Sequence, residues 1–133
     1  MSEVLVVRRS ELSPDTAQTP GIQRLSAIDR ATVGSERLWV GEATMQPGLR
    51  SGAHHHGDCD SVVCVTRGRV RIRFGERLEN SAEAGAGDYV YIPAHLVHQE
   101  INLSDSEAID SIVIRSGDNI VVNVRLPADV TDV

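Results

Sequence analysis

The chain of 133 residues has room for one domain, and no second independent core is expected in it. Its hydrophobic fraction of 41 % is ordinary for a globular protein and argues against disorder. The formal net charge of −6 argues against nucleic acid as a partner, because an acidic surface repels phosphate. All 13 basic residues are arginine, a usage that we interpret as the bias of a GC-rich bacterial genome.

Membrane and secretion signals are not expected from this sequence. No segment approaches the roughly 20 apolar residues that span a bilayer. The N-terminus has no basic patch followed by an apolar run, as a secretory signal would have. If Cys59 and Cys64 share a strand, their odd separation puts them on opposite faces, where they cannot form a disulfide. These features predict a cytoplasmic protein that does not bind membranes.

Short apolar runs, rich in valine and isoleucine and separated by turn residues, recur along the whole chain. This pattern is typical of an all-β sandwich or barrel. In chain order we expect a strand at 4–7, a loop at 10–20 and a short helix at 22–31. Further strands are expected at 38–45, 62–66, 70–74, 89–92, 98–103, 109–115 and 120–126.

Within the expected strand at 70–74 and just before it, arginines alternate with apolar residues. Arg69, Arg71 and Arg73 fall on one face, and the apolar residues between them fall on the other. The arginines are interpreted as a solvated outer face, which carboxylates of a partner subunit could pair with, rather than as an anion-binding stripe.

Three of the five histidines stand together at 54–56, and carboxylates follow within four residues. In an extended chain His54 and His56 project to one side and His55 to the other. Two neutral imidazoles on one side can share a metal ion, because each ring offers one lone pair. Imidazole with a carboxylate suits Zn, Fe, Mn, Ni or Co and does not choose among them.

A second stretch, 87–102, carries two more histidines, His95 and His98, at another strand–turn–strand corner. Together the two stretches resemble the two signatures of the cupin superfamily. Gly48, His54, His56 and Gly68 match the first signature in type and spacing, and Gly87, Pro93, His98 and Asn102 match the second. The resemblance covers about residues 35–115. It implies a double-stranded β-helix, or jelly-roll barrel, with one divalent transition metal ion on His54, His56 and His98.

The sequence departs from these signatures in two places. The glutamate of the first signature is missing: Asp60 has the right distance from His56, whereas counting back from Gly68 gives Ser61. Either a one-residue bulge lets Asp60 reach the ion, with Asp58 as the weaker candidate, or the site has three histidines and open positions. We favour Asp60 as the fourth ligand. The second departure is His95, which stands where the signature has glycine; it would be a proton shuttle, a supporting partner of the site or an exposed loop histidine.

Four other residues have two interpretations each. Cys64 is four residues after Asp60, so on one strand both side chains lie on the same face. If Asp60 faces the interior, Cys64 faces it too, as a ligand or as a small hydrophobic residue. Trp39, Tyr89 and Tyr91 would line a ligand cavity or pack in the core.

Cupins that resemble this chain include dioxygenases, isomerases, decarboxylases and polyketide cyclases, and the fold does not select among them. The resemblance implies a metal-dependent enzyme that acts on a small oxygenated organic molecule, aromatic ones included, by dioxygenation, cyclisation or isomerisation. His95 or Glu100 would move protons if either faces the cavity. The alternative is a non-catalytic module that binds a small ligand through its metal. We also expect a homodimer, in which the end strands 4–7 and 120–126 pair with a second subunit and cover open sheet edges.

Overall fold

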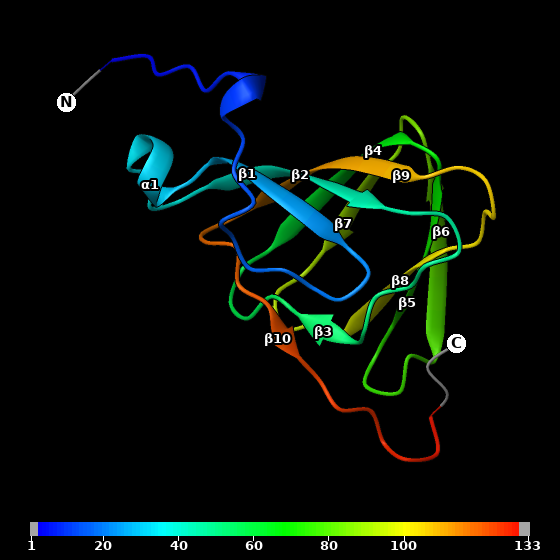
Figure 1. The fold of residues 1–133 in the computed structure, drawn as a ribbon. Coiled ribbons are helices and arrows are strands. Elements are labelled where there is room, and N and C mark those ends of the chain that lie inside the picture. The colour runs from blue at the N-terminus through cyan, green and yellow to red at the C-terminus, as the bar shows by residue number, and fades with distance from the viewer. Residues whose placement is uncertain (1–2, 131–133) are drawn as a thin grey trace.

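The computed structural model describes residues 3–130 and contains two five-stranded antiparallel sheets that face each other (Figure 1). The first sheet has the order β1-β2-β9-β4-β7, and the second has the order β10-β3-β8-β5-β6. This architecture confirms the expected all-β jelly roll. The strands are β1 (Gln23–Ile28), β2 (Trp39–Met45), β3 (His54–His55), β4 (Ser61–Arg67), β5 (Arg69–Phe74), β6 (Asn80–Gly85), β7 (Tyr89–Ile92), β8 (His98–Asn102), β9 (Ile109–Arg115) and β10 (Val122–Asn123).

Helical structure is confined to the 3-10 turn η1 (Arg9–Glu11) and the single turn α1 (Arg30–Val33) in the part of the chain that the structure describes. None of these helical segments has the length and hydropathy that would let it cross a membrane.

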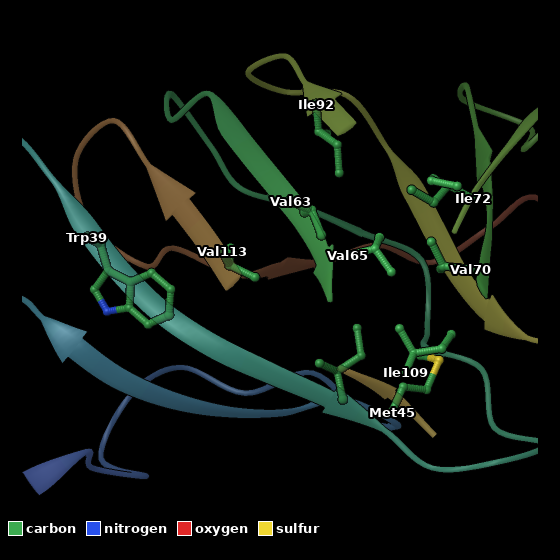
Figure 2. Packing of buried hydrophobic residues seen from close by; sticks show 11 residues of the cluster. Trp39, Met45, Val63, Val65, Val70, Ile72, Ile92, Ile109 and Val113 are labelled. Atoms are coloured by element: carbon green, nitrogen blue, oxygen red, sulfur yellow. The ribbon is translucent and has the colours of Figure 1, made fainter. Parts of the chain in front are cut away.

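The apolar core lies between the two sheets, and strand alternation builds it. Val63 and Val65 of β4 and Val70 and Ile72 of β5 point inward, while their neighbours in sequence point outward. Figure 2 shows these side chains meeting those of the other strands in one cluster. The other labelled members are Trp39, Met45, Ile92, Ile109 and Val113.

The rest of the interior is polar, which is unusual for so small a barrel. Arg24, His54 and His98 are each at most 1 % exposed, and Arg115 is 2 % exposed. Buried charge must find a polar partner, because its transfer from water is costly. The polar half of the interior therefore marks the region to be explained by function.

The segment 22–31, expected to be a short helix, is mostly strand. Residues 23–28 form β1, which pairs with β2, and the helical turn α1 begins only at Arg30, with Asp29 as its N-cap. The helix prediction was wrong because two of the inward residues of this strand, Arg24 and Ser26, are polar. Their period of two is therefore invisible in a hydrophobic pattern.

The expected end strands also differ. Residues 4–7 form no strand, and Val4 is 91 % exposed. Of the segment 120–126 only β10 pairs, with β3. Strand β6 was not expected, because its sequence is polar and small and only Ala84 of it is buried. It lies at the edge of the second sheet and pairs with β5 alone.

The outward positions of the strands are now defined. Arg69, Arg71 and Arg73 lie on the outer face of the second sheet as expected, but Arg69 and Arg71 pair with Glu83 of the neighbouring strand β6, each at 3.1 Å, within this chain. Cys64 is half-buried on the outer face of β4, so its expected interior position is wrong. The cause is the parity of β4, in which Ser61, not Asp60, points inward.

The aromatic side chains divide between the core and the surface. Trp39 is 1 % exposed and packs in the core, which is one of its two expected roles. Tyr89 and Tyr91 are 79 % and 64 % exposed, so neither lines the interior. Cys59 and Cys64 are both free thiols.

Four positions of the sequence signatures have a left-handed backbone: Gly48, Gly68, Gly87 and His95. Gly68 joins β4 to β5 with φ +81°, and a Cβ there would lie 2.6 Å from the carbonyl oxygen of Ala108. His95, which replaces the glycine of the second signature, has φ +64°. The turn between β7 and β8 thus keeps the conformation that favours glycine. His95 adopts it at a cost in conformational energy, because it has a Cβ atom.

The signature asparagine, Asn102, holds two loops together. Its side chain is 2 % exposed; Nδ2 donates to the carbonyl oxygens of Met45, Gln46 and Glu107, and Oδ1 accepts from the backbone of Ser104 at 3.0 Å. These bonds join the end of β2 to the connection between β8 and β9.

We predict that Asn102→Ala lowers the free energy of unfolding by about 1–3 kcal/mol, because buried carbonyl and amide groups lose their partner. Urea denaturation followed by fluorescence of Trp39 measures this. Ser106→Ala, on the exposed part of the same connection, is the matched control and should change little. Equal midpoints for the two variants would contradict the role of Asn102.

Candidate metal centre

Three histidines from two strands meet inside the barrel. His54 lies on β3 and is directly opposite His98 of β8, and His56 follows β3 by one residue. Their ligand nitrogens all lie within 4.8 Å of one another. As expected for an extended chain, the short strand β3 directs His54 and His56 to one side and His55 to the other.

Each of the three rings is held by a backbone carbonyl. The Nδ1–H of His54 donates to Gly52 O at 2.8 Å, that of His56 to Ile120 O at 2.7 Å, and that of His98 to Leu96 O at 2.9 Å. A carbonyl oxygen can only accept, so Nδ1 carries the proton and the lone pair of each neutral ring is on Nε2. This is the arrangement in which metal-binding histidines are oriented by a supporting hydrogen bond.

The free lone pairs of the three rings lie close together, and two of them have no hydrogen-bond partner. Nε2 of His54 and Nε2 of His98 are buried and make no hydrogen bond. A buried polar atom without a partner is costly and calls for a ligand. A divalent transition metal fits this donor set, because three neutral imidazoles bind Zn, Fe, Co, Ni or Mn and leave further positions for water or substrate.

Electrostatics keeps the three rings neutral, as metal binding requires. Burial lowers the pKa of His54 to about 4. Burial, aided by the charge of Arg115, lowers the pKa of His56 to about 2, and burial also lowers the pKa of His98.

The expected fourth ligand, Asp60, does not lie with the histidines. It is exposed on the surface just before β4, and its Oδ1 accepts a hydrogen bond from the backbone of Ala94 at 3.0 Å. The bulge that would turn Asp60 inward is not formed. Ser61 points inward instead, is 1 % exposed, and occupies the position obtained by counting back from Gly68.

Asp58 and His95, the other loop residues considered for the site, pair with each other outside it. His95 Nε2 lies 2.7 Å from Asp58 Oδ1, and their side chains are 65 % and 93 % exposed. This geometry corresponds to the exposed loop histidine among the alternatives for His95, rather than to a group that faces the three rings.

Glu100 brings a carboxylate to the centre. It lies two residues after His98 on β8 and therefore on the same face of that strand. Its Oε2 is 4.0 Å from Nε2 of His54, and its side chain is 16 % exposed. Glu100 therefore faces the interior, as a role in proton transfer would require.

Two arginines beside the histidines were not foreseen. Arg24 of β1 and Arg115 of β9 line the same small cavity as His56, His98 and Glu100. The sequence indicates an inward Arg115, because strand alternation places it on the same face of β9 as the residues at 109, 111 and 113, which point inward. Arg24 had none, because its strand was interpreted as a helix.

The cavity beside the histidines is small. Its space is enough for about one water molecule, and the apolar side chains of Ile22, Val63 and Val113 are among its walls. A larger groove of about 590 Å³, lined by Arg50, Arg71 and Arg73 among others, has none of the histidines in its wall. The candidate metal centre is therefore buried, with little space for solvent beside it.

Comparison with known proteins agrees with this geometry. A polyketide synthase protein, CurC of Streptomyces cyaneus, is 30 % identical over 104 residues, which are 77 % of this chain and 64 % of that protein. The structure of the polyketide cyclase RemF from Streptomyces resistomycificus has a TM-score of 0.72 at 18 % identity, covering 96 % of this chain and 89 % of that one. A Bacillus subtilis oxalate decarboxylase variant has a TM-score of 0.70 at 19 % identity, covering 86 % of this chain and 31 % of that one.

The sequence family described as the Cupin_2 cupin domain matches residues 41–115, which include β2 to β9. This region holds the three histidines and most of both sheets. Since it makes up more than half of the chain, the chain belongs to the cupin family.

Proposed function

We propose that the chain is a metal-dependent cupin enzyme that cyclises or isomerises a small oxygenated organic molecule with an enolisable carbonyl. The observation that carries this proposal is the set of buried imidazole lone pairs without partners, on His54 and His98, with His56 beside them. These three neutral rings would hold one divalent transition metal ion, which supplies Lewis-acid polarisation of a carbonyl or enol oxygen.

The choice of reaction is supported by the ligand set and by the relatives. Three neutral histidines with no carboxylate among them leave more positive charge on an ion, which favours Lewis-acid chemistry over dioxygenation. The relatives named as a polyketide synthase protein and as a polyketide cyclase favour the same choice.

Glu100 is the residue that we assign to proton transfer. Its carboxylate lies in the closed interior, 4.0 Å from a ligand nitrogen, where it can take a proton from a carbon next to a carbonyl and return it elsewhere. The apolar walls of the cavity exclude water, which strengthens the electrostatic contacts of a bound enolate. His95, paired with Asp58 at the surface, has no part in this step.

A non-catalytic module that binds a small ligand through its metal is the second candidate. The observation that favours it is the small cavity, which has room for about one water molecule. A turnover screen with enolisable β-dicarbonyl compounds separates the two: metal-dependent proton exchange at carbon supports the enzyme, and binding without exchange supports the module.

We predict one first-row divalent metal ion per chain when the protein is purified without an affinity tag. Elemental analysis should give a ratio near one for the parent and for His55→Ala, because His55 lies on the opposite side of β3 and its Nδ1 accepts from Gly57 instead. His56→Ala should lose most of the metal. Metal below one-tenth equivalent in the reconstituted parent would refute the site.

The carboxylate of the site gives a second prediction. Glu100→Gln should weaken metal binding by about 10- to 100-fold, the loss found when a close supporting group of a ligand is removed, whereas Asp60→Asn should not change it. Competition with a chromophoric chelator measures both affinities. If Asp60→Asn instead weakens metal binding and Glu100→Gln leaves it unchanged, Asp60 would be the ligand.

We further propose a homodimer that forms through the outer face of the first sheet, not through the chain ends. Tyr91 pairs in register with Val62, and Cys64 with Ile112, so apolar side chains lie side by side across three strands. Tyr89, Tyr91 and Ile112 are 79 %, 64 % and 40 % exposed. An apolar face of this kind is typical of a protein–protein contact.

Light scattering at micromolar concentration should give the mass of a dimer for the parent. Ile112→Glu with Tyr91→Glu should give a monomer, because charge is then buried in the contact. Leu103→Glu is the matched control, an exposed apolar residue that lies outside the three strands of this face. A parent that is monomeric, or a double variant that stays dimeric, refutes this surface.

A further inference from the structure

The interior of the barrel carries more positive than negative charge. Arg24 and Arg115 are 1 % and 2 % exposed, and both line the cavity beside the histidines. Glu100 is the one carboxylate in the wall of that cavity, so the formal charge there is +2 − 1 = +1 with neutral histidines. Buried charges are stable only when paired, and a divalent ion on the histidines would raise the excess further.

The partners of the two guanidinium groups are mostly neutral. Arg24 Nη1 donates to Thr19 Oγ1 at 2.8 Å. Arg115 donates through Nε to Asn119 Oδ1 at 3.0 Å and through Nη1 to Ser61 Oγ at 2.5 Å. These bonds fix the direction of both side chains without neutralising them.

Both arginines stay charged in spite of their burial. Burial lowers the pKa of Arg115 to about 9 and also lowers the pKa of Arg24. The delocalised guanidinium group of arginine nevertheless keeps its proton in proteins. A guanidinium that is fixed by neutral acceptors and lines a cavity is suited to a negatively charged oxygen.

We infer that the substrate is an anion and that Arg24 and Arg115 hold its negatively charged oxygen beside the three histidines. This inference rests on the proposed function and specifies its substrate class: a small β-keto or enol acid, whose carboxylate or enolate the arginines pair with. Both arginines line the same cavity as His56 and His98, so an oxygen held between the guanidinium groups lies beside the histidines. Arg24 and Arg115 are then specificity-determining residues.

The inward serine leaves Arg115 with a neutral partner. Ser61 occupies the position of the signature glutamate when counted back from Gly68, and its hydroxyl accepts the hydrogen bond of Arg115. Ser61 therefore adds no negative charge beside this guanidinium. An acid substrate that a glutamate would repel is attracted by the guanidinium.

The test compares a β-keto acid with its neutral ester. Isothermal titration calorimetry with acetoacetate and with methyl acetoacetate is done on the protein as purified and again after metal removal and dialysis. The parent should bind the acid at least about tenfold more tightly than the ester, as expected for hydrogen bonds to charged groups. Arg24→Gln and Arg115→Gln should lose that preference, and Arg71→Gln, an outer-face arginine paired with Glu83, should keep it.

The lysine variants Arg24→Lys and Arg115→Lys retain the charge and test the case in which glutamine variants unfold; they should keep a preference for the acid. Equal affinity of the parent for acid and ester overturns the inference. So does acetate or chloride binding as tightly as acetoacetate, which would indicate an adventitious ion only. Failure of the metal centre is seen separately, in the metal content, because acid binding is also measured without metal.

Discussion

The candidate centre depends on three hydrogen bonds in which a backbone carbonyl accepts the Nδ1–H of a histidine. Two of the carbonyls, of Gly52 and Leu96, lie two residues before their own histidine, so local chain geometry sets those rings. The third, of Ile120, is 64 residues away from His56. The orientation of His56 therefore requires the segment that leads into β10 to pack against β3. A strand of only two residues thus has a defined task, which is to keep that carbonyl in place.

A barrel with a polar interior needs compensating stability elsewhere. The apolar cluster between the sheets supplies it, with valine and isoleucine side chains from β4, β5, β7 and β9 (Figure 2). The polar half is kept in place by hydrogen bonds rather than by packing alone. Arg115 illustrates this, since Ser61 and Asn119 accept from its guanidinium while its charged group lies 5.8 Å from the centre of the Trp39 ring.

The sequence predicted those parts of the molecule whose physical signal is local. Strands β2, β7 and β9 were found because their inward residues are largely apolar, and the histidines were found because their spacing is short. Strand β1 was missed because Arg24 and Ser26 are its inward residues, and β6 because it is a polar edge strand. Asp60 was favoured as a ligand because of its distance from His56 along the chain. That distance does not tell which residues of a strand point inward, and in the fold Ser61 points inward instead.

Some of the residues that hold the site lie outside the family match. Residues 41–115 supply the histidines and Glu100, whereas Arg24 and Thr19 precede this region and Asn119 and Ile120 follow it.

Asn119 connects these two flanking segments, because its Oδ1 accepts from Arg115 and its Nδ2 donates to Thr16 Oγ1 and to the carbonyl of Ala17, both at 2.8 Å. Gln18 continues the connection by exchanging two hydrogen bonds with the backbone of Arg24. A substitution of Asn119 or Gln18 would therefore alter the surroundings of a guanidinium without touching a histidine ring. The C-terminal flank serves both parts of the proposed site, because Asn119 holds Arg115 while the carbonyl of Ile120 orients His56. The flanks thus offer positions at which ligand contacts can change while the histidines of the family core are kept.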